Sequence, residues 1–117
     1  MKKVEAIIRP EKLSAVKQAL EEIGVHGMTA YEVHGRGEQK GLEFTHRAGK
    51  FRVDMLPKSK LEVVVKDDKV EEVVEAICAA ARTGDVGDGK IFILPMVTAI
   101  KVRTGEVEED SPVKETV

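Results

Sequence analysis

The sequence predicts an α+β fold in which one antiparallel sheet carries two helices on a single face. Three observations support this: short β-branched segments, two segments with apolar residues at helical spacing, and the order of these segments. The order is strand, helix, strand, long loop, strand, helix, strand, which is the plan of a ferredoxin-like βαββαβ sandwich. A chain of 117 residues suits one such domain.

The first half of the chain supplies two strands and one helix. Residues 3–10 (KVEAIIRP) are short and rich in β-branched residues, which is typical of a strand. Pro10 suits the first turn of a helix, where a missing N–H removes no hydrogen bond. Residues 28–35 (MTAYEVHG) are predicted to form the second strand. Between them, four apolar residues at helical spacing lead to a glycine stop: Leu13, Val16, Leu20, Ile23 and then Gly24.

The second half repeats the pattern. Residues 60–66 (KLEVVVK) and 90–94 (KIFIL) are predicted strands, and Pro95 favours an edge position for the latter. Asp68 and Glu71 resemble a capping box at a helix start. Residues 97–103 are expected to continue as extended chain. The apolar face of the second helix comprises Val70, Val73, Val74, Ile77, Cys78 and Ala81.

Two of the strands are too apolar for a sheet with one face in water. Residues 63–65 are consecutive valines, and residues 90–94 are apolar on both faces. Continuous apolar strands indicate burial on both sides. Two helices cannot cover both faces, so the sequence predicts self-association through the open face. Partial cover by the C-terminal segment is the alternative.

Residues 36–57 lack a clear periodicity and are long for a connection within a domain. Mixed charges with Leu42, Phe44 and Phe51 predict a mobile interaction arm, and a solvated hairpin without a role is the alternative. The expected domain is residues 1–106 with its mobile loop at 37–55, followed by an acidic tail at 107–117.

Composition excludes several classes of protein. A net charge of −2 gives no general nucleic-acid footprint, and a single cysteine, Cys78, excludes an intramolecular disulfide or a two-cysteine metal site. No apolar run approaches the roughly 18 residues of a membrane helix. The start of the chain shows no signal-peptide pattern. We therefore expect a cytoplasmic protein that does not insert into membranes.

Residues 84–90 (GDVGDGK) fit the first seven positions of a Walker A loop, but Ile91 stands where Ser or Thr would hold magnesium. The context is also reversed, since a helix precedes this loop and a strand follows it. A P-loop NTPase is therefore rejected. Three glycines within six residues can still present backbone N–H groups to an anion, and Lys90 adds a positive charge. The alternative is a plain helix-to-strand turn with Gly84 as its C-cap.

Residues 35–41 (GRGEQKG) form a second glycine-rich loop. It is no Rossmann fingerprint, because a charged arm follows it instead of a helix. Gln39 offers a carbonyl oxygen to a metal. Arg36, Lys40 and Lys58 offer positive charge to carboxylates or phosphates.

Together the two loops resemble the PII nitrogen-regulatory family. TGDVGDGKIF (83–92) is similar to that family's second nucleotide loop, and RTGE (103–106) to its C-terminal signature. Further similar segments follow in order and at the expected spacing: GMT (27–29), GRGEQKG (35–41) and VDMLPKSKLEVVV (53–65). The resemblance covers residues 1 to about 106.

The resemblance implies a homotrimer of ferredoxin-like subunits that binds ATP or ADP in the clefts between subunits. Magnesium-ATP would recruit 2-oxoglutarate there. The resemblance further implies a signal-transduction protein that is not an enzyme. Its long loop would regulate an ammonium transporter or a nitrogen-assimilation enzyme.

The same resemblance implies three sets of site residues. The nucleotide set is Gly27, Met28, Thr29, Gly35, Arg36, Gly37, Glu38, Val64, Gly87, Asp88, Gly89, Lys90, Lys101 and Arg103. The 2-oxoglutarate set is Arg9, Gln39, Lys40, Gly41 and Lys58, with Gln39 also the metal ligand. Arg47 and Phe51 belong to the partner-binding loop.

Four residues depart from the family's pattern. Phe51 replaces a modifiable tyrosine and Gly49 a serine that is phosphorylated in some members, which argues against covalent control. Glu38 places a carboxylate beside the phosphates, which is expected to weaken ATP binding. Lys101 replaces an arginine, which keeps the charge but loses the bidentate fork.

Two alternatives to the sensor remain: a small phosphate-ester enzyme, or another nucleotide-binding regulator on the same fold. The enzyme needs a poised base, for which the three histidines, His26, His34 and His46, form no visible catalytic set. An RNA-binding module would need exposed aromatic residues on the central strands, and VEAII and LEVVV have none.

Overall fold

A computed structural model of the chain describes residues 1–37, 42–46, 49–53 and 55–109, with the backbone alone described for 42–46 and 49–53. Its elements are β1 (Lys2–Ile8), η1 (Pro10–Lys12), α1 (Leu13–Glu22), β2 (Thr29–Gly35), β3 (Leu42–His46), β4 (Gly49–Val53), β5 (Leu56–Val65), η2 (Asp67–Lys69), α2 (Val70–Ala81), β6 (Gly89–Pro95), β7 (Ala99–Ile100) and β8 (Val107–Glu108).

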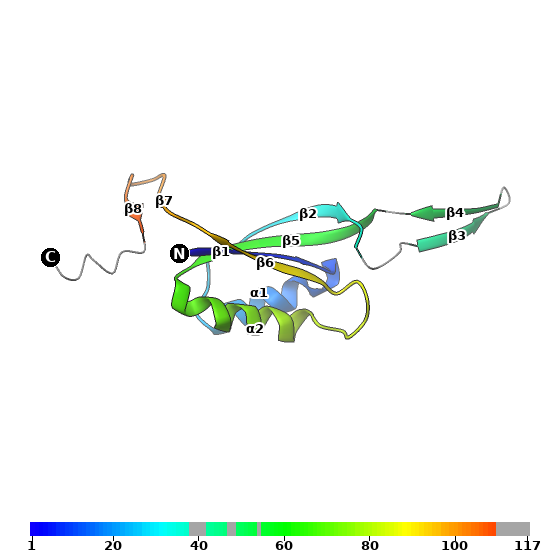
Figure 1. The fold of residues 1–117 in the computed structure, drawn as a ribbon, viewed down its shortest axis with the longest axis horizontal. Coiled ribbons are helices and arrows are strands. Elements are labelled where there is room, and N and C mark those ends of the chain that lie inside the picture. Colours follow the sequence, from blue (N-terminus) through cyan, green and yellow to red (C-terminus); the bar gives the residue numbers. More distant parts are fainter. Residues whose placement is uncertain (38–41, 47–48, 54, 110–117) are drawn as a thin grey trace.

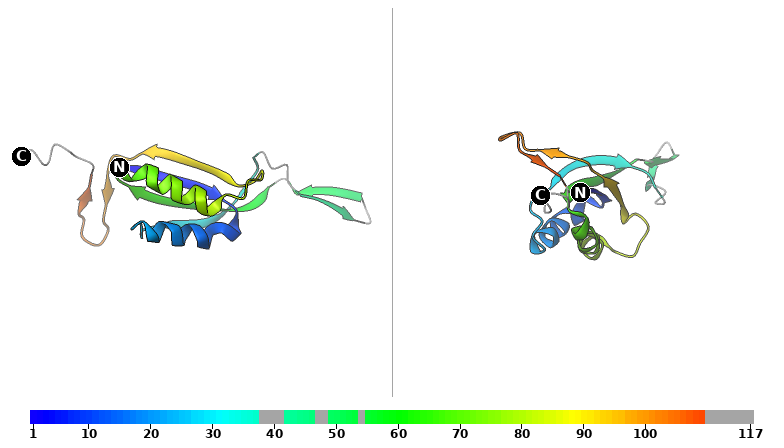
Figure 2. Two further views of the ribbon diagram at one scale, coloured as in Figure 1. Left: turned by 90° about the horizontal axis from the view of Figure 1, so that it is seen from below. Right: turned by 60° about the vertical axis from the view of Figure 1, so that its left-hand side comes forward.

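Four of these strands form one antiparallel sheet in the order β2-β5-β1-β6. Both α-helices lie on one face of it, as Figures 1 and 2 show. The predicted ferredoxin-like βαββαβ fold is confirmed. Strand β6 is an edge strand that ends at Pro95, as predicted from the missing proline N–H.

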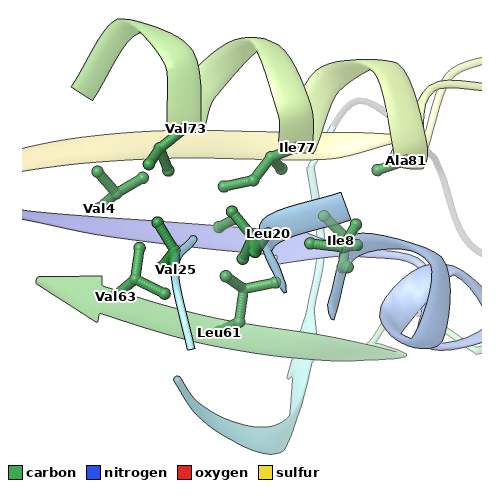
Figure 3. Close-up of a cluster of buried hydrophobic side chains, with 11 residues drawn as sticks. Val4, Ile8, Leu20, Val25, Leu61, Val63, Val73, Ile77 and Ala81 are labelled. Carbon is green, nitrogen blue, oxygen red and sulfur yellow. The ribbon is translucent and has the colours of Figure 1, made fainter. Parts of the chain in front are cut away.

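The core lies between the helices and the covered face of the sheet. Strands β1 and β5 bury alternate residues there, among them Val4 and Leu61. Leu20 from α1 and Ile77 from α2 pack against them (Figure 3). Each such side chain contributes roughly 1.5–3 kcal/mol through the apolar surface it removes from water. Cys78, predicted on the apolar face of α2, is only half-buried and lies outside this core.

Both α-helices begin after a 3-10 turn. The first turn opens with Pro10, as predicted. The predicted capping box at Asp68 and Glu71 is wrong, because α2 starts after Lys69 and has no side-chain cap hydrogen bond. The N–H of Lys69 donates instead to the carbonyl of Lys66 at 3.0 Å, so the backbone turn provides the helix entry.

The arm between β2 and β5 contains more regular structure than its sequence suggested. Strands β3 and β4 pair antiparallel from Leu42↔Val53 to His46↔Gly49, and β5 starts already at Leu56. The hairpin extends away from the sheet (Figure 1). Apolar and polar residues do alternate over 42–45, which is strand periodicity, but the many charges concealed it.

The segment after β6 turns back on itself, and the prediction of extended chain over 97–103 is therefore wrong beyond Ile100. Strand β7 pairs with β8, and the turn between them holds Gly105 at φ +71°. The N–H of Lys101 donates to the Glu106 carbonyl at 2.9 Å, and that of Gly105 to the Lys101 carbonyl at 2.7 Å. Glycine tolerates the positive φ that this tight turn needs.

The open face of the sheet carries exposed apolar side chains. Val64, Phe92 and Leu94 are 42%, 43% and 38% exposed, so burial on both faces does not occur within one chain. The β7–β8 hairpin continues beyond the end of the sheet and leaves this face uncovered (Figures 1 and 2). No helix in the part of the chain that the structure describes is long and apolar enough to cross a bilayer.

Candidate functional site

The 83–88 loop, residues 83–88 between α2 and β6, is organised around the carboxylate of Asp88. Oδ2 accepts hydrogen bonds from the N–H groups of Thr83 and Gly84, both at 2.9 Å. Oδ1 accepts one from the Thr83 hydroxyl and one from Arg9 Nε at 3.2 Å. These hydrogen bonds, that of the Thr83 hydroxyl above all, hold the pKa of Asp88 well below its usual range.

Two cations from the sheet hold the backbone of this loop. Arg9, just after β1, donates through Nη2 to the carbonyl of Val86 at 2.9 Å. Lys58 on β5 donates to the carbonyl of Gly87 at 2.9 Å. Burial, and then the charge of Arg9, lower the pKa of Lys58. A partly desolvated ammonium group of this kind gains strongly from an arriving anion.

Glycine is required at the end of the loop for reasons of space. Gly84, Gly87 and Gly89 have φ of +94°, +106° and +107°. A Cβ on Gly89 would lie 1.7 Å from the carbonyl oxygen of Ile7, where β6 runs beside β1. The helix C-cap is Arg82, so Gly84 is not the simple C-cap that the alternative interpretation required.

A pocket of about 380 Å³ lies beside the 83–88 loop. Both predicted glycine loops reach it, together with three cations and two carboxylates, so its charge favours an anion by a small margin. The lining residues are Ile7, Gly35, Arg36, Gly37, Leu56, Lys58, Asp85, Val86, Gly87, Asp88, Gly89, Lys90 and Phe92.

Within the nucleotide set, the family resemblance assigns Gly27, Met28, Thr29 and Val64 to the base, and these four residues lie elsewhere. Gly27 and Val64 line a second hollow of about 420 Å³ with His26, Lys66 and Lys69. On β5, Val64 is six residues beyond Lys58, a separation of roughly 20 Å along a strand. Thr29, exposed at the start of β2, is paired with Glu62, and Met28 packs partly against the core. One chain therefore does not bring the two groups of predicted ligands together.

Lys101 and Arg103 also lie away from the pocket. They belong to the turn between β7 and β8, at the other end of β6 from Gly89 (Figure 1). The Nζ of Lys101 is 3.7 Å from a carboxylate oxygen of Glu106 and 3.9 Å from one of Glu108.

Several predicted residues fall outside the described part of the chain: Glu38, Gln39, Lys40, Gly41 and Arg47. Phe51 is placed by its backbone alone, on β4 opposite Phe44. Among the described residues no group of three or more His, Cys, Asp and Glu side chains could hold a metal ion.

Thr83 was not predicted from the sequence as a member of this site. Its hydroxyl bonds Asp88 and also accepts from the N–H of Asp85 at 3.2 Å. A threonine or serine that starts a glycine-rich turn, with an aspartate near its end, is the signal that would have indicated it. Ile7 and Phe92 were missed as well, since only the register of β1 and β6 brings them to the pocket.

Comparison with known proteins gives a consistent answer. The profile of the family described as nitrogen regulatory protein P-II matches residues 1–106. Nitrogen regulatory protein P-II 2 of Methanothermobacter thermautotrophicus is 55% identical over 106 residues, which are 91% of this chain and 92% of that protein. The nitrogen regulatory protein P-II of Cereibacter sphaeroides is 55% identical over 111 residues, 95% of this chain and 99% of its own length. That of Haemophilus influenzae is 51% identical over 111 residues, again 95% and 99%.

The family match spans nearly the whole chain, and these relatives are aligned over almost their full lengths. The chain therefore belongs to the nitrogen regulatory protein P-II family, whose members bind nucleotide effectors and are regulators, not enzymes.

Proposed function

We propose that this protein senses ATP or ADP together with 2-oxoglutarate, and that the phosphates bind in the pocket beside the 83–88 loop. The observation that carries the proposal is the meeting of three distant segments, Gly35–Gly37, Lys58 and Gly87–Lys90, at one pocket. Glycine backbone that approaches closely and nearby cations are what a polyphosphate needs. Lys90 and Arg36 supply point charges, and Lys58 would exchange its contact with the Gly87 carbonyl for one with a carboxylate.

The base end of the site comes from a neighbouring copy in this proposal. Gly27 and Val64 line a different hollow from Lys90, next to Met28 and Thr29. Lys101 and Arg103, which the resemblance assigns to the phosphates, lie at the other end of β6 from Gly89 and would come from a neighbouring copy as well. The exposed open face supports association, because it presents Val64, Phe92 and Leu94. That three copies assemble is inferred from the family resemblance.

The charges at the centre of the open face are compatible with its burial. Lys3 lies 3.1 Å from Glu5 and 3.5 Å from Glu62, and Lys60 lies 3.6 Å from Glu5. Tyr31 donates to Glu62 at 3.3 Å. Since two lysines already face two glutamates, covering this surface leaves no charge without a counter-charge.

The keto acid would join the nucleotide through magnesium. ATP phosphates supply most of the ligands, Gln39 adds one neutral oxygen, and the carboxylate and keto oxygens of 2-oxoglutarate complete the shell. Lys58 pairs with the distal carboxylate, next to Lys40 and Gly41. The loop at 37–55, including Arg47 and Phe51, then contacts an ammonium transporter or a nitrogen-assimilation enzyme in the cytoplasm, where these metabolites are found.

Isothermal titration calorimetry tests this function. We expect 2-oxoglutarate to bind only with magnesium and ATP present, and not with ADP, which lacks the γ-phosphate. Thermodynamic linkage requires that 2-oxoglutarate increase the affinity for ATP by the same factor by which ATP increases the affinity for 2-oxoglutarate. Equal affinity for 2-oxoglutarate with ATP, with ADP and without nucleotide would refute the proposed site.

A further inference from the structure

Arg9 holds the 83–88 loop from outside the pocket. The described residues that line the pocket include Lys58 and Lys90 but not Arg9. Its guanidinium reaches the loop at two points, the carboxylate of Asp88 and the carbonyl of Val86. The side chains of Arg9 and Asp88 are only 19% and 24% exposed.

The carboxylate of Asp88 has no remaining capacity for a ligand. A carboxylate has about four lone-pair sites. Four donors already occupy them: the N–H and hydroxyl of Thr83, the N–H of Gly84, and Nε of Arg9. A direct contact between this carboxylate and a phosphate-bound metal would therefore require that the loop open.

The charge of Asp88 is also compensated locally. An isolated carboxylate at this position would oppose the attraction between a phosphate and Lys90, since both residues line the pocket. The guanidinium of Arg9 offsets this charge, since its Nε lies 3.2 Å from Oδ1 of Asp88 and Arg9 is not among the lining residues. The arrangement thus gives the N–H groups of the loop an acceptor whose own negative charge is balanced by Arg9.

We propose that Arg9, Asp88 and Thr83 form a latch that sets the conformation of the 83–88 loop before a nucleotide arrives. They are positioning residues for phosphate binding and not ligands of the phosphates, which changes the roles expected for Arg9 and Asp88 from the sequence. The inference rests on the proposed function of the pocket. Because Arg9 and Thr83 both act through one carboxylate, the effects of replacing them are coupled.

The test uses four variants: Arg9→Met, Thr83→Val, the double variant, and Thr83→Ser, which keeps the hydroxyl. Calorimetry with ATP or ADP, without keto acid, should show about ten-fold weaker binding for Arg9→Met and for Thr83→Val. Thr83→Ser should bind both nucleotides as the unchanged protein does. The double variant should bind nucleotide with almost the same affinity as whichever single variant binds it less tightly. Lys90→Ala combined with Thr83→Val provides the additive control, because Lys90 acts on the ligand directly.

Hydrogen exchange in the ligand-free protein checks the latch without any nucleotide. The Gly84 amide should be protected in the unchanged protein and in Thr83→Ser, and should exchange faster in Arg9→Met and Thr83→Val at an unchanged melting temperature. Unaltered nucleotide affinity in Arg9→Met, or simple additivity with Thr83→Val, would overturn the latch. If the unchanged protein bound neither nucleotide, the proposed function would fail, and the Gly84 exchange rates alone would decide the latch.

Discussion

The 83–88 loop and the β7–β8 hairpin lie at opposite ends of β6, and both turn on glycines with positive φ. The loop is anchored to other elements, since Arg9 binds it from the end of β1 and Lys58 from β5. The described contacts of the hairpin turn are internal, such as that between Lys101 and Glu106.

The hairpin also exposes large apolar side chains to solvent. In the hairpin Val102 is 100% exposed and Ile100 is 64% exposed, with Val97 just before it at 86%. The difference shows that contacts within one chain fix the 83–88 loop, whereas the hairpin exposes apolar side chains, as a segment proposed to pack against another copy would.

The largest effect should come from Gly89, at the anchored end. In Gly89→Ala the new Cβ meets the Ile7 carbonyl at 1.7 Å, so β6 must move away from β1. We expect a loss of several kcal/mol in unfolding free energy and no detectable nucleotide binding. Gly84→Ala is the control, because it has a similar φ with nothing within 4 Å, and should lose roughly 1 kcal/mol. Equal melting temperatures for the two variants would contradict the close approach of β6 to β1.

The next largest effects are expected from replacing the two lysines of the pocket, Lys90 and Lys58, which the proposed function assigns to the nucleotide and to the keto acid respectively. Lys90→Ala should weaken the binding of ATP, and with it that of 2-oxoglutarate, about ten-fold or more, because a charge-assisted contact with the phosphates is lost. Lys58→Ala should abolish 2-oxoglutarate binding and weaken ATP binding much less than Lys90→Ala does, through the lost contact with the Gly87 carbonyl. Calorimetry with both ligands measures this. The reverse pattern would show that the two lysines are assigned to the wrong ligands.

A smaller effect is expected at the hairpin. Val102→Asp should weaken association and, with it, nucleotide binding by about ten-fold, because burying one valine is worth roughly 1.5 kcal/mol. Ala79→Asp on the exposed side of α2 is the control and should change neither. Light scattering and calorimetry report the two effects. An unaffected Val102→Asp variant would mean that the hairpin does not pack against a neighbour.

The smallest effect is expected from lowering the pH, which should loosen the 83–88 loop by protonating Asp88. The pKa of Asp88 is lowered in the folded chain by its bonds to Thr83, so the carboxylate stabilises the loop fully above its unfolded pKa of about 4. This contribution declines as pH falls from there toward the folded pKa. Hydrogen exchange at Gly84, corrected for its intrinsic pH dependence, should stay constant from pH 7 to 5 and rise only below about pH 4. A rise already at pH 6 would contradict it.

The sequence predicted the fold well because both periodicities were visible. The β-branched segments and the Leu13–Leu20 and Val70–Ala81 patterns became strands and helices of the expected order. Strands β3 and β4 were not predicted, because the many charges obscure the alternation of apolar and polar residues and because the two strands pair only with each other in a hairpin.

The site was predictable only in part. Motif spacing identified both glycine loops, of which Gly35–Gly37 and Gly87–Lys90 line one pocket together with Lys58. The bonds of Thr83 and Arg9 to Asp88 depend on the three-dimensional path of the loop, which no periodicity encodes. The separation of Val64 from Lys90 likewise became visible only when the sheet register was known.

The central claim, that one nucleotide site is built from two copies, can be tested by mixing variants. Lys90→Ala removes a charge from the phosphate end and Arg103→Ala one from the hairpin end, so each variant alone should bind ATP weakly. After unfolding and refolding together in equal amounts, about a quarter of the clefts should combine an intact Lys90 with an intact Arg103 from different chains. Calorimetry should then recover that fraction of sites at the affinity of the unchanged protein. Recovery of no such sites, with mixed assemblies verified by mass spectrometry, would contradict the claim.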